Sequence, residues 1–282
     1  MSLHPDTYMG IVRSALAEDI GRGDITTEYL NIGDALGQAK IVAKEDGVIA
    51  GLPIAKAVFR ELDPNVKFKS LVEDGAKVHK GTQIAELHGK ASALLSGERV
   101  ALNFLQQLSG IATFTYIMVR AVKGSKAVIK DTRKTTPGMR LIEKYAVKMG
   151  GGTNHRMGLH DAILLKDNHI DIAGGITEAV ERVRAKNIEL LPIEVETRNL
   201  DEVQEALDVK ADIIMLDNMS LIDMEQAIKL IDGKAEIEVS GNVNTLNVTE
   251  IASLGVDIIS VGAITHSPDA LDISMLFSMQ KS

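Results

Sequence analysis

Short apolar runs rich in β-branched residues alternate with amphipathic stretches from about residue 126 to the end of the chain. The runs predict strands at Ala127–Lys130, Ala162–Asp167, Leu191–Glu196, Asp212–Asp217, Glu236–Ser240 and Asp257–Gly262. The stretches between them predict helices at Thr177–Lys186, Leu200–Val209, Leu221–Ile231 and Leu246–Leu254. Because strands that are apolar on both faces and alternate with helices form parallel sheets, the pattern predicts an α/β fold, and a closed barrel is favoured over an open doubly wound sheet.

The first part of the chain has a different pattern. Residues 1–19 predict a short helix, which Gly21 and Gly23 end. A small α+β domain is predicted from strand-like runs at Gln38–Lys44, Lys67–Leu71 and Gln83–Leu87 and a helix near Ile54–Leu62. A long apolar helix at about residues 93–119 leads to the barrel, so we expect an N-terminal domain at 1–119 and a barrel domain at 120–282.

Length and composition narrow the class of protein. The chain has 282 residues, 45% of them hydrophobic and 25% charged, which is typical of a globular protein with roughly two domains. It has no cysteine, so disulfides, thiolate metal sites and a cysteine nucleophile are excluded. No apolar run approaches the roughly 18 residues of a membrane helix, and Met1 to Arg13 lack the pattern of a signal peptide, so we expect a cytoplasmic protein.

The charge is unevenly distributed. The net charge is −8 and aromatic residues are few, which argues against nucleic-acid binding. Between Arg99 and Lys166, however, 12 Lys or Arg stand against 3 acids, a local balance of +9, while the rest of the chain carries −17. Solvent-exposed helix faces best explain Lys123, Lys126, Lys144 and Lys148. The remaining cations predict a focused site for a small polyanion.

Chemically active residue types recur where the predicted strands end. Arg133 and Lys134 follow the first barrel strand, and later strands end at Lys166, Glu196 and Asp217. Because the carboxyl ends of parallel strands share one face of the sheet, we expect these side chains to converge. For Arg133 and Lys134 the alternative is a strand–helix loop whose charges point into solvent. Helix capping would explain Asp217 and Ser240 but not Lys166 or Glu196. Glu194 shares a strand face with Glu196 and is expected inside the barrel.

Glycine-rich segments mark further candidate contacts. Gly150–Gly152 precede His155 and Arg156, whose side chains can donate to a carboxylate, although a capped helix end followed by a linker would also explain the glycines. The last two strand–helix loops contain Ser240-Gly241-Asn242 and Gly262-Ala263, where barrels commonly bind phosphate through backbone amides. No histidine pair has metal-ligand spacing, whereas the carboxylates Glu196 and Asp217 would suit Mg²⁺.

The long apolar helix carries a polar stripe. Arg99, Asn103, Gln106 and Gly110 recur at spacings of four, three and four. Either the stripe faces solvent, or it forms part of an intersubunit or active-site surface.

Four motifs resemble the quinolinate phosphoribosyltransferase family, the carboxylating nicotinate-nucleotide pyrophosphorylases. The motifs are Glu18-Asp-Ile-Gly-Arg-Gly-Asp-Ile-Thr-Thr27, Asp131-Thr-Arg-Lys-Thr-Thr-Pro-Gly-Met-Arg140, Gly150-Gly-Gly-Thr-Asn-His-Arg-Met-Gly-Leu159 and Leu165-Lys-Asp-Asn-His169. The resemblance runs essentially from end to end. It implies an N-terminal open α+β sandwich, an incomplete seven-stranded α/β (TIM-like) barrel, and a homodimer whose active sites are shared between subunits.

The resemblance also implies roles for individual residues. Quinolinate would bind to Arg99 from the neighbouring subunit and to Arg133, His155, Arg156 and Lys166. The phosphoribosyl pyrophosphate would bind near Lys134, Glu196 and Asp217, with Mg²⁺ at the two carboxylates, and its 5′-phosphate would bind at Ser240, Gly241, Asn242, Gly262 and Ala263. Lys134, Lys166, Glu196 and Asp217 would be catalytic. The sequence departs from many members at Asn242, where they carry a second glycine.

The implied activity belongs to NAD biosynthesis. A phosphoribosyl group moves from 5-phosphoribosyl 1-pyrophosphate to quinolinate, which loses CO₂ and gives nicotinate mononucleotide and pyrophosphate. One alternative is a related phosphoribosyltransferase that acts on another anionic ring. A second alternative, a non-catalytic phosphate-ligand sensor on a barrel, is disfavoured because the acidic and basic residues are all present. No nucleic-acid or membrane partner is expected.

Overall fold

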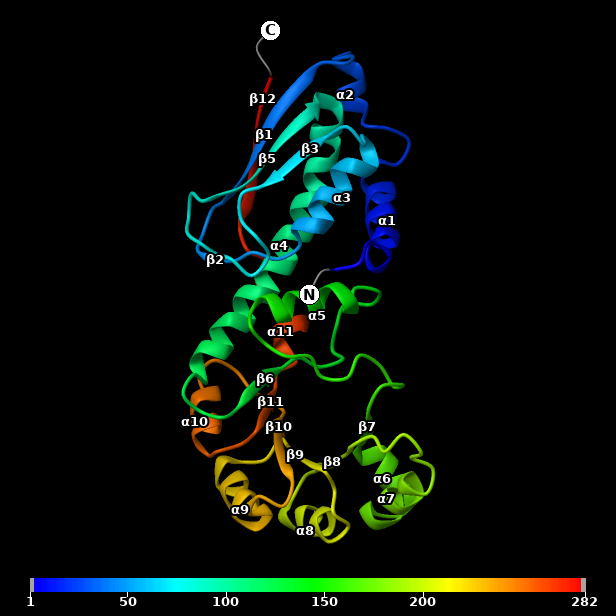
Figure 1. Ribbon diagram of the computed structural model, residues 1–282, viewed down its shortest axis with the longest axis vertical. Coiled ribbons are helices and arrows are strands. Elements are labelled where there is room, and N and C mark those ends of the chain that lie inside the picture. The colour runs from blue at the N-terminus through cyan, green and yellow to red at the C-terminus, as the bar shows by residue number, and fades with distance from the viewer. Residues whose placement is uncertain (1–2, 280–282) are drawn as a thin grey trace. The chain divides into compact units, whose positions relative to one another are not determined.

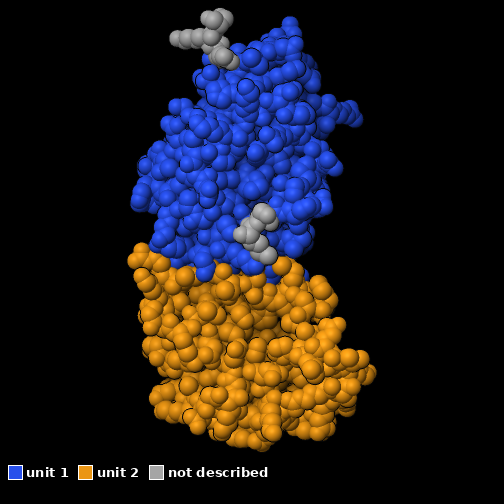
Figure 2. Space-filling model, viewed as in Figure 1, with its two compact units in different colours: residues 1–116, 135–151, 267–282 blue, residues 117–134, 152–266 orange. Residues whose placement is uncertain are grey.

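The computed structural model describes residues 3–279, which separate into two compact units (Figure 2). Unit 1 comprises residues 1–116, 135–151 and 267–282, and unit 2 comprises residues 117–134 and 152–266. The helix α4 (Ala91–Ala121) runs from unit 1 into unit 2 and confirms the long helix expected at 93–119. None of the described helices has the length and hydropathy that a membrane span requires.

Unit 1 is built on an antiparallel sheet of four strands in the order β12-β1-β5-β3 (Figure 1). The strands are β1 (Leu36–Ala43), β3 (Lys67–Ser70), β5 (Gln83–Lys90) and β12 (Ile273–Met279), and β2 (Gly47–Val48) pairs separately with β4 (Lys77–Val78). The helical elements are η1 (Pro5–Thr7), α1 (Met9–Ile20), α2 (Ile25–Tyr29), α3 (Leu52–Leu62), α5 (Arg140–Met149) and the first part of α4. Along β1 buried positions alternate with less buried ones, the period expected of a sheet with one face on a core.

The half-buried carboxylate of Asp74 joins two parts of unit 1. Asp74 accepts the backbone N–H groups of Gly51 and Leu52 at the start of α3, and the hydroxyl of Tyr145 on α5 donates to it over 2.6 Å. Burial raises the pKa of Asp74, although the three hydrogen bonds oppose that rise. The carboxylate therefore caps one helix and fastens another.

Unit 2 contains a parallel sheet of six strands in the order β6-β11-β10-β9-β8-β7. The strands are β6 (Val128–Lys130), β7 (Ile163–Leu165), β8 (Ile193–Thr197), β9 (Ile213–Asp217), β10 (Glu236–Ser240) and β11 (Ile258–Ser260). The helices are α6 (Asp167–Ala173), α7 (Ile176–Arg184), α8 (Leu200–Asp208), α9 (Leu221–Ile231), α10 (Val248–Ser253) and α11 (Ala263–His266). All six predicted strands and the four predicted helices are present, within a few residues of the expected bounds.

The sheet of unit 2 is an incomplete barrel. The first strand of the chain order, β6, pairs with the last, β11, as closure requires. On its other edge Lys130 forms a single parallel bridge with Thr153, at the place where a seventh strand would lie between β6 and β7. The described residues thus give six strands and one bridge, consistent with the partial barrel that the family resemblance implies.

Two segments that the sequence analysis placed in the barrel domain belong to unit 1. One is residues 135–151 with α5, and the other is the C-terminal segment with β12. Strand β12 pairs with β1 along its whole length, from Gly37 opposite Met279 to Ala43 opposite Ile273. A pairing between strands more than 200 residues apart leaves no periodic signal in the sequence, so the hydrophobic pattern could not assign it.

Four lysines were predicted to lie on solvent-exposed helix faces, and three of them are exposed. Lys123, Lys126 and Lys148 are exposed, but Lys144 is 1% exposed, so the expectation of a solvent-facing Lys144 is wrong. The physical reason is that α5 is enclosed on all sides, with every residue from Ile142 to Val147 buried, whereas the prediction assumed one exposed face. On α4, Arg99 and Asn103 are exposed, while Gln106 donates to the carbonyl of Ile273 and Gly110 is buried.

Candidate active site

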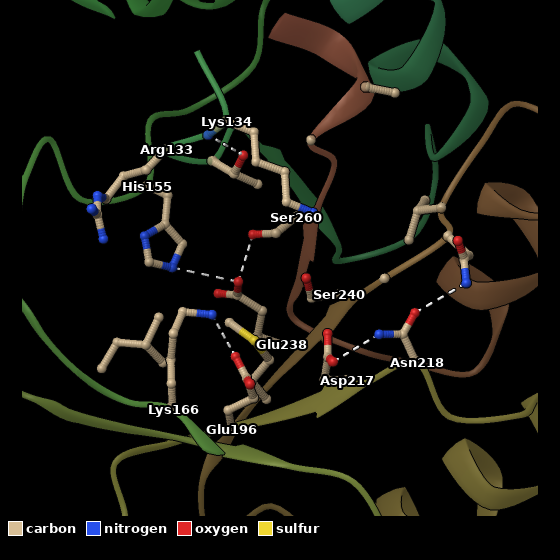
Figure 3. A pocket seen from close by; sticks show the side chains of 18 of the residues that line it. Arg133, Lys134, His155, Lys166, Glu196, Asp217, Asn218, Glu238, Ser240 and Ser260 are labelled. Carbon is tan, nitrogen blue, oxygen red and sulfur yellow. Dashed lines mark hydrogen bonds and ion pairs between the residues drawn. The ribbon is translucent and has the colours of Figure 1, made fainter. Parts of the chain in front are cut away.

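A cavity of about 760 Å³ lies at the carboxyl ends of the strands of unit 2 (Figure 3). It is lined by residues that follow or end all six strands. Twelve of the residues singled out from the sequence line it, namely Arg133, Lys134, His155, Arg156, Lys166, Glu196, Asp217, Ser240, Gly241, Asn242, Gly262 and Ala263. Of the residues for which the resemblance implies a binding or catalytic role, only Arg99 does not line the cavity; it belongs to unit 1. The side chains that were predicted to converge at the carboxyl ends of the strands therefore line one cavity.

An ion pair in the cavity joins Lys166 and Glu196. Lys166 follows β7, Glu196 lies on β8, and Lys166 Nζ lies 2.6 Å from Glu196 Oε2 (Figure 3). The glutamate side chain is 9% exposed and the lysine side chain 45% exposed, so the ammonium group reaches the cavity while it neutralises a buried carboxylate. Of the two glutamates on β8, Glu196 lines the cavity and Glu194 does not, as the sequence analysis expected.

Asp217 and the loops after β9 and β10 form the other wall. The register of the sheet sets Asp217 beside Ser240, and Asn218 Nδ2 donates to Asp217 Oδ2 over 2.8 Å. Asn218 Oδ1 in turn accepts from Asn242 Nδ2 over 3.1 Å. This chain of hydrogen bonds orients the Asp217 carboxylate and ties it to the loop that follows β10.

That loop turns through left-handed backbone. Gly241 has φ +91°, and a Cβ there would overlap the side chain and backbone of Asn218, so only glycine fits. Asn242 has φ 52°, a conformation that asparagine tolerates better than most residues. The substitution of asparagine for the family's second glycine therefore keeps the left-handed turn, and the side chains of Asn244 and Asn247 donate to the Asn242 carbonyl.

The loops after β6 and β11 are fastened to each other. Thr265 Oγ1 on α11 donates to the carbonyl of Lys134 over 2.8 Å. A Cβ on Gly262 would lie 2.9 Å from Lys134 Cδ, so the absence of a side chain at Gly262 lets the lysine stem pass. Lys134 is held beside the backbone amides of the last strand–helix loop.

The guanidinium groups of Arg133 and Arg156 share one side of the cavity. Burial, and after it the nearby charge of Arg133, lower the pKa of Arg156, while Glu194 and Asp161 oppose the shift. An anion that binds between two like charges in a partly desolvated site is stabilised, because its attraction to both offsets their mutual repulsion.

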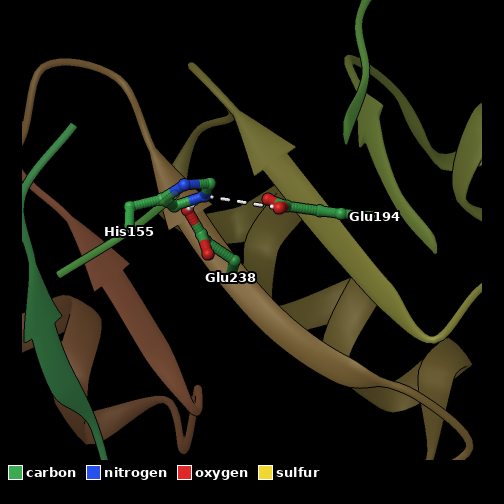
Figure 4. Close-up of side chains that lie close together, drawn as sticks. All are labelled: His155, Glu194 and Glu238. Atoms are coloured by element: carbon green, nitrogen blue, oxygen red, sulfur yellow. Dashed lines mark ion pairs between the residues drawn. The ribbon is translucent and has the colours of Figure 1, made fainter. Parts of the chain in front are cut away.

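His155 and Glu238, which line the cavity, lie close to the buried Glu194 (Figure 4). His155 Nε2 is 3.3 Å from Glu194 Oε2 and 3.5 Å from Glu238 Oε1, and Glu238 Oε1 also accepts from Ser260 Oγ over 2.5 Å. Glu238 was not predicted from the sequence as a residue of the site. The signal was present, because Glu238 interrupts the apolar strand β10 with the same two-residue period that identified Glu194 as interior.

A third buried acid fixes the backbone that carries His155. Asp131 is fully buried at the end of β6, and it accepts from the backbone N–H of His155 over 2.9 Å and from Asn154 Nδ2 over 2.8 Å. The backbone N–H of Arg156 donates to His155 Nδ1 over 2.7 Å. Because Nδ1 accepts a hydrogen bond, the proton of a neutral ring is on Nε2, where it points at the two glutamates.

Two sets of side chains offer ligands for a metal ion. The ligand atoms of His155, Glu194 and Glu238 all lie within 4.8 Å of one another, but Nε2 of His155 carries a proton and so donates instead of ligating. Glu196 and Asp217 supply only carboxylate oxygens, both line the cavity, and Asp217 is partly exposed. That donor set fits Mg²⁺, which prefers oxygen ligands and retains several waters.

Comparisons with known proteins give matches over most of the chain. The N-terminal and C-terminal domain models of quinolinate phosphoribosyl transferase match residues 24–109 and 111–276. A probable nicotinate-nucleotide pyrophosphorylase [carboxylating] of Synechocystis is 53% identical over 264 residues, covering 92% of this chain and 89% of the relative, and one of Bacillus subtilis is 46% identical, covering 92% and 89%. NadC from Streptococcus pyogenes has a TM-score of 0.95 at 42% identity with full coverage of both chains, and the nicotinate-nucleotide pyrophosphorylase of Francisella tularensis has 0.94 at 43% identity, covering 98% of each. The chain belongs to the quinolinate phosphoribosyltransferase family.

Proposed function

We propose that the barrel cavity is the active site at which this chain carries out the reaction of its family. In that reaction the phosphoribosyl group of 5-phosphoribosyl 1-pyrophosphate moves to quinolinate, and nicotinate mononucleotide, pyrophosphate and CO₂ are formed. The observation that carries the proposal is that one cavity holds the cations Arg133, Arg156 and Lys166 together with the carboxylates Glu196 and Asp217. In Figure 3, Arg133 and Asp217 lie on opposite sides of the ion pair between Lys166 and Glu196. An anionic ring and a sugar that becomes cationic need this arrangement.

The cationic side would bind the two carboxylates of quinolinate. Arg133 and Arg156 offer forked donors that match carboxylate oxygens, and Lys166 adds an ammonium group. The ring nitrogens of His155 are engaged with Arg156, Glu194 and Glu238, so in this geometry His155 contributes chiefly by holding the segment that carries Arg156.

The phosphoribosyl pyrophosphate would occupy the opposite wall. Its 5′-phosphate would meet the backbone amides of Ser240, Gly241, Asn242, Gly262 and Ala263, which glycine and left-handed asparagine leave accessible. Lys134, held beside Gly262, would bind the pyrophosphate. Glu196 and Asp217 would hold Mg²⁺, which when bound neutralises phosphate charge.

The chemistry follows from these positions. The quinolinate ring nitrogen attacks the anomeric carbon as pyrophosphate departs, and positive charge builds on the ribose. The carboxylates of Glu196 and Asp217 stabilise that charge, and Lys134 stabilises the negative charge on the leaving group. The new cationic ring nitrogen then withdraws electrons from the adjacent carbon, which loses CO₂ and takes up a proton.

An assay with both substrates tests the function. Purified protein, quinolinate, 5-phosphoribosyl 1-pyrophosphate and Mg²⁺ should yield nicotinate mononucleotide and CO₂ in equal amounts, as measured by mass spectrometry and ¹⁴CO₂ release. Nicotinate in place of quinolinate should give no product, because it lacks the second carboxylate. Turnover of nicotinate without turnover of quinolinate would instead support a related enzyme acting on another ring.

We further propose a cytoplasmic homodimer in which Arg99 of one subunit completes the site of the other. Arg99 is exposed on α4 in unit 1, and the same unit exposes apolar side chains at Ile25, Tyr29 and Leu30, which suit an interface. The cysteine-free composition is compatible with a reducing compartment.

Subunit mixing tests the shared site. Homodimers of Arg99→Ala and of Glu196→Ala should each be nearly inactive. After subunit exchange about half of the dimers are mixed and each mixed dimer has one intact site, so activity should recover to about a quarter of wild type. The control is Arg60→Ala, an exposed arginine on α3 of the same unit, which should keep full activity. Exchange that is verified by native mass spectrometry but restores no activity would refute the shared site.

A further inference from the structure

The carboxylates of Glu194 and Glu238 form an acidic pair beneath the basic side of the cavity. Glu238 is fully buried and Glu194 is 4% exposed, and both approach the same atom, His155 Nε2. Among the described residues, Glu194 Oε1 and Glu238 Oε2 are buried oxygens with no hydrogen-bond donor. A buried, ionised carboxylate with an unsatisfied oxygen is costly, and two side by side are more so.

The donors around the pair are too few for two negative charges. Nε2 of His155 supplies one proton for both glutamates, because Nδ1 is occupied by the N–H of Arg156. Ser260 on β11 supplies one more, to Glu238 Oε1. Positive charge comes from Lys130 on β6, from Lys166 at the end of β7 and from Arg156, whose charge interacts with that of Glu194. Strand β9 presents the uncharged Met215 beside Glu238.

We propose that Glu238 is a proton-binding residue of the substrate site, which takes up a proton when a dicarboxylate ring binds above it. The reason is electrostatic. Glu238 itself lines the cavity, so the negative charges of a bound anion add to that of Glu194 in disfavouring an ionised Glu238. Protonation of Glu238 also removes the cost of holding a second buried negative charge beside Glu194.

The pKa of Glu238 fits this role. Burial, followed by the charge of Glu194, raises the pKa of Glu238 to about 7, while His155, the Ser260 hydrogen bond and Lys130 limit the rise. A carboxyl group with its pKa near neutrality is partly ionised in the free protein, so there is a proton for it to gain. By linkage, an anion that raises this pKa must bind more weakly as the pH rises through and above neutrality.

The inference rests on the proposed function, since it needs quinolinate in this cavity, and the experiment separates the two. Isothermal titration of quinolinate at pH 7.5, in two buffers of different ionisation enthalpy, should show uptake of up to about three-quarters of a proton per site in the wild type, because a group with a pKa of about 7 is already about one-quarter protonated at that pH. The dissociation constant should rise up to about tenfold per pH unit above neutrality. The same slope should appear in kcat/KM for quinolinate.

The variant Glu238→Gln keeps the shape and an acceptor for Ser260 but cannot ionise. It should bind quinolinate without proton uptake, with an affinity independent of pH and at least equal to that of the wild type at pH 8.5. The matched control is Glu236→Gln, the same change two residues earlier on β10 at an exposed position, which should retain the proton uptake of the wild type. Should Glu238→Gln not fold, Glu194→Gln is the second test, because it removes one of the two causes that raise the pKa of Glu238. Proton uptake at pH 7.5 should then decrease, and the weakening of quinolinate binding should begin at a lower pH than in the wild type; no change in either would refute the proposal.

Two results would overturn the proposal. One is quinolinate turnover by the wild type with no proton uptake and a flat pH profile of kcat/KM, which would leave the function intact. The other is proton uptake that persists in Glu238→Gln. An infrared difference spectrum of the wild type gives an independent reading, because quinolinate binding should add a protonated carboxyl band. Absence of turnover with quinolinate would instead count against the proposed function.

Discussion

Replacing Lys166 by methionine should separate binding from stability at the centre of the site. Methionine keeps an unbranched apolar stem but removes the ammonium group that lies 2.6 Å from Glu196 Oε2. A charge-assisted hydrogen bond to substrate is worth roughly 1.5–3 kcal/mol, so quinolinate affinity should fall about 10- to 150-fold. Turnover should fall at least as far.

The cost to stability should be smaller. Lys166 is 45% exposed, so solvent screens the pair and its own contribution is about 1 kcal/mol or less, but the change leaves Glu196 buried without a cation. We expect a loss of about 1–2 kcal/mol, or roughly 2–8 °C in Tm. The double variant Lys166→Met with Glu196→Gln should recover most of that stability and none of the binding.

Calorimetric titration of quinolinate and thermal unfolding of the same samples measure both quantities. The control is Lys123→Met, an exposed lysine of the same basic segment, which should leave both unchanged. A specific role of Lys166 would be refuted if Lys166→Met bound quinolinate within twofold of the wild type, or if Lys123→Met weakened binding as much as Lys166→Met. Quinolinate affinity would then depend on the total charge of the basic segment and not on the position of Lys166.

Two further substitutions test the loops and the half-buried carboxylate of unit 1. Gly241→Ala should lose binding of phosphoribosyl pyrophosphate, because the added Cβ overlaps Asn218. The control Gly255→Ala has nearly the same φ, +88°, but open space around it, so it should bear a similar backbone strain of about 1–2 kcal/mol and bind normally. Equal binding by the two variants would refute the steric reason. Tyr145→Phe should destabilise the protein by about 1–3 kcal/mol at pH 8, because the tyrosine hydroxyl donates to the ionised carboxylate of Asp74. Chemical denaturation should show a smaller loss as the pH falls through the raised pKa of Asp74, because that carboxyl then becomes protonated. A loss that is the same at every pH would show that Asp74 stays in one protonation state.

The barrel and its mouth were largely predictable from the sequence because both depend on local patterns. Apolar runs bounded by helical stretches identified six strands, and the rule that parallel strands end on one face gathered Lys166, Glu196 and Asp217 into one cavity. Each of these inferences uses residues close together in the chain, where periodicity is informative.

The failures concern contacts made at long range. Strand β12 pairs with β1, and α5 is enclosed in unit 1, which buries Lys144 against expectation. Glu238 was missed for a related reason, since a charged residue inside an apolar strand is informative only when its partners are known. Those partners, His155, Glu194 and Ser260, come from three other segments of the chain.

The charge of the cavity also differs from the charge of the segment that indicated it. The segment between Arg99 and Lys166 carries +9, yet the cavity is lined by four Lys or Arg and three Asp or Glu, so it is close to balanced. Selectivity must therefore come from where the charges lie and from whether each is ionised. If Glu238 is neutral when substrate is bound, the net charge of the cavity becomes more positive by one unit without any displacement of a side chain, while the carboxylates of Glu196 and Asp217 remain available for the role that we propose at the ribose. The buried proton site would thus let one small cavity attract a dianion and still stabilise a cation beside it.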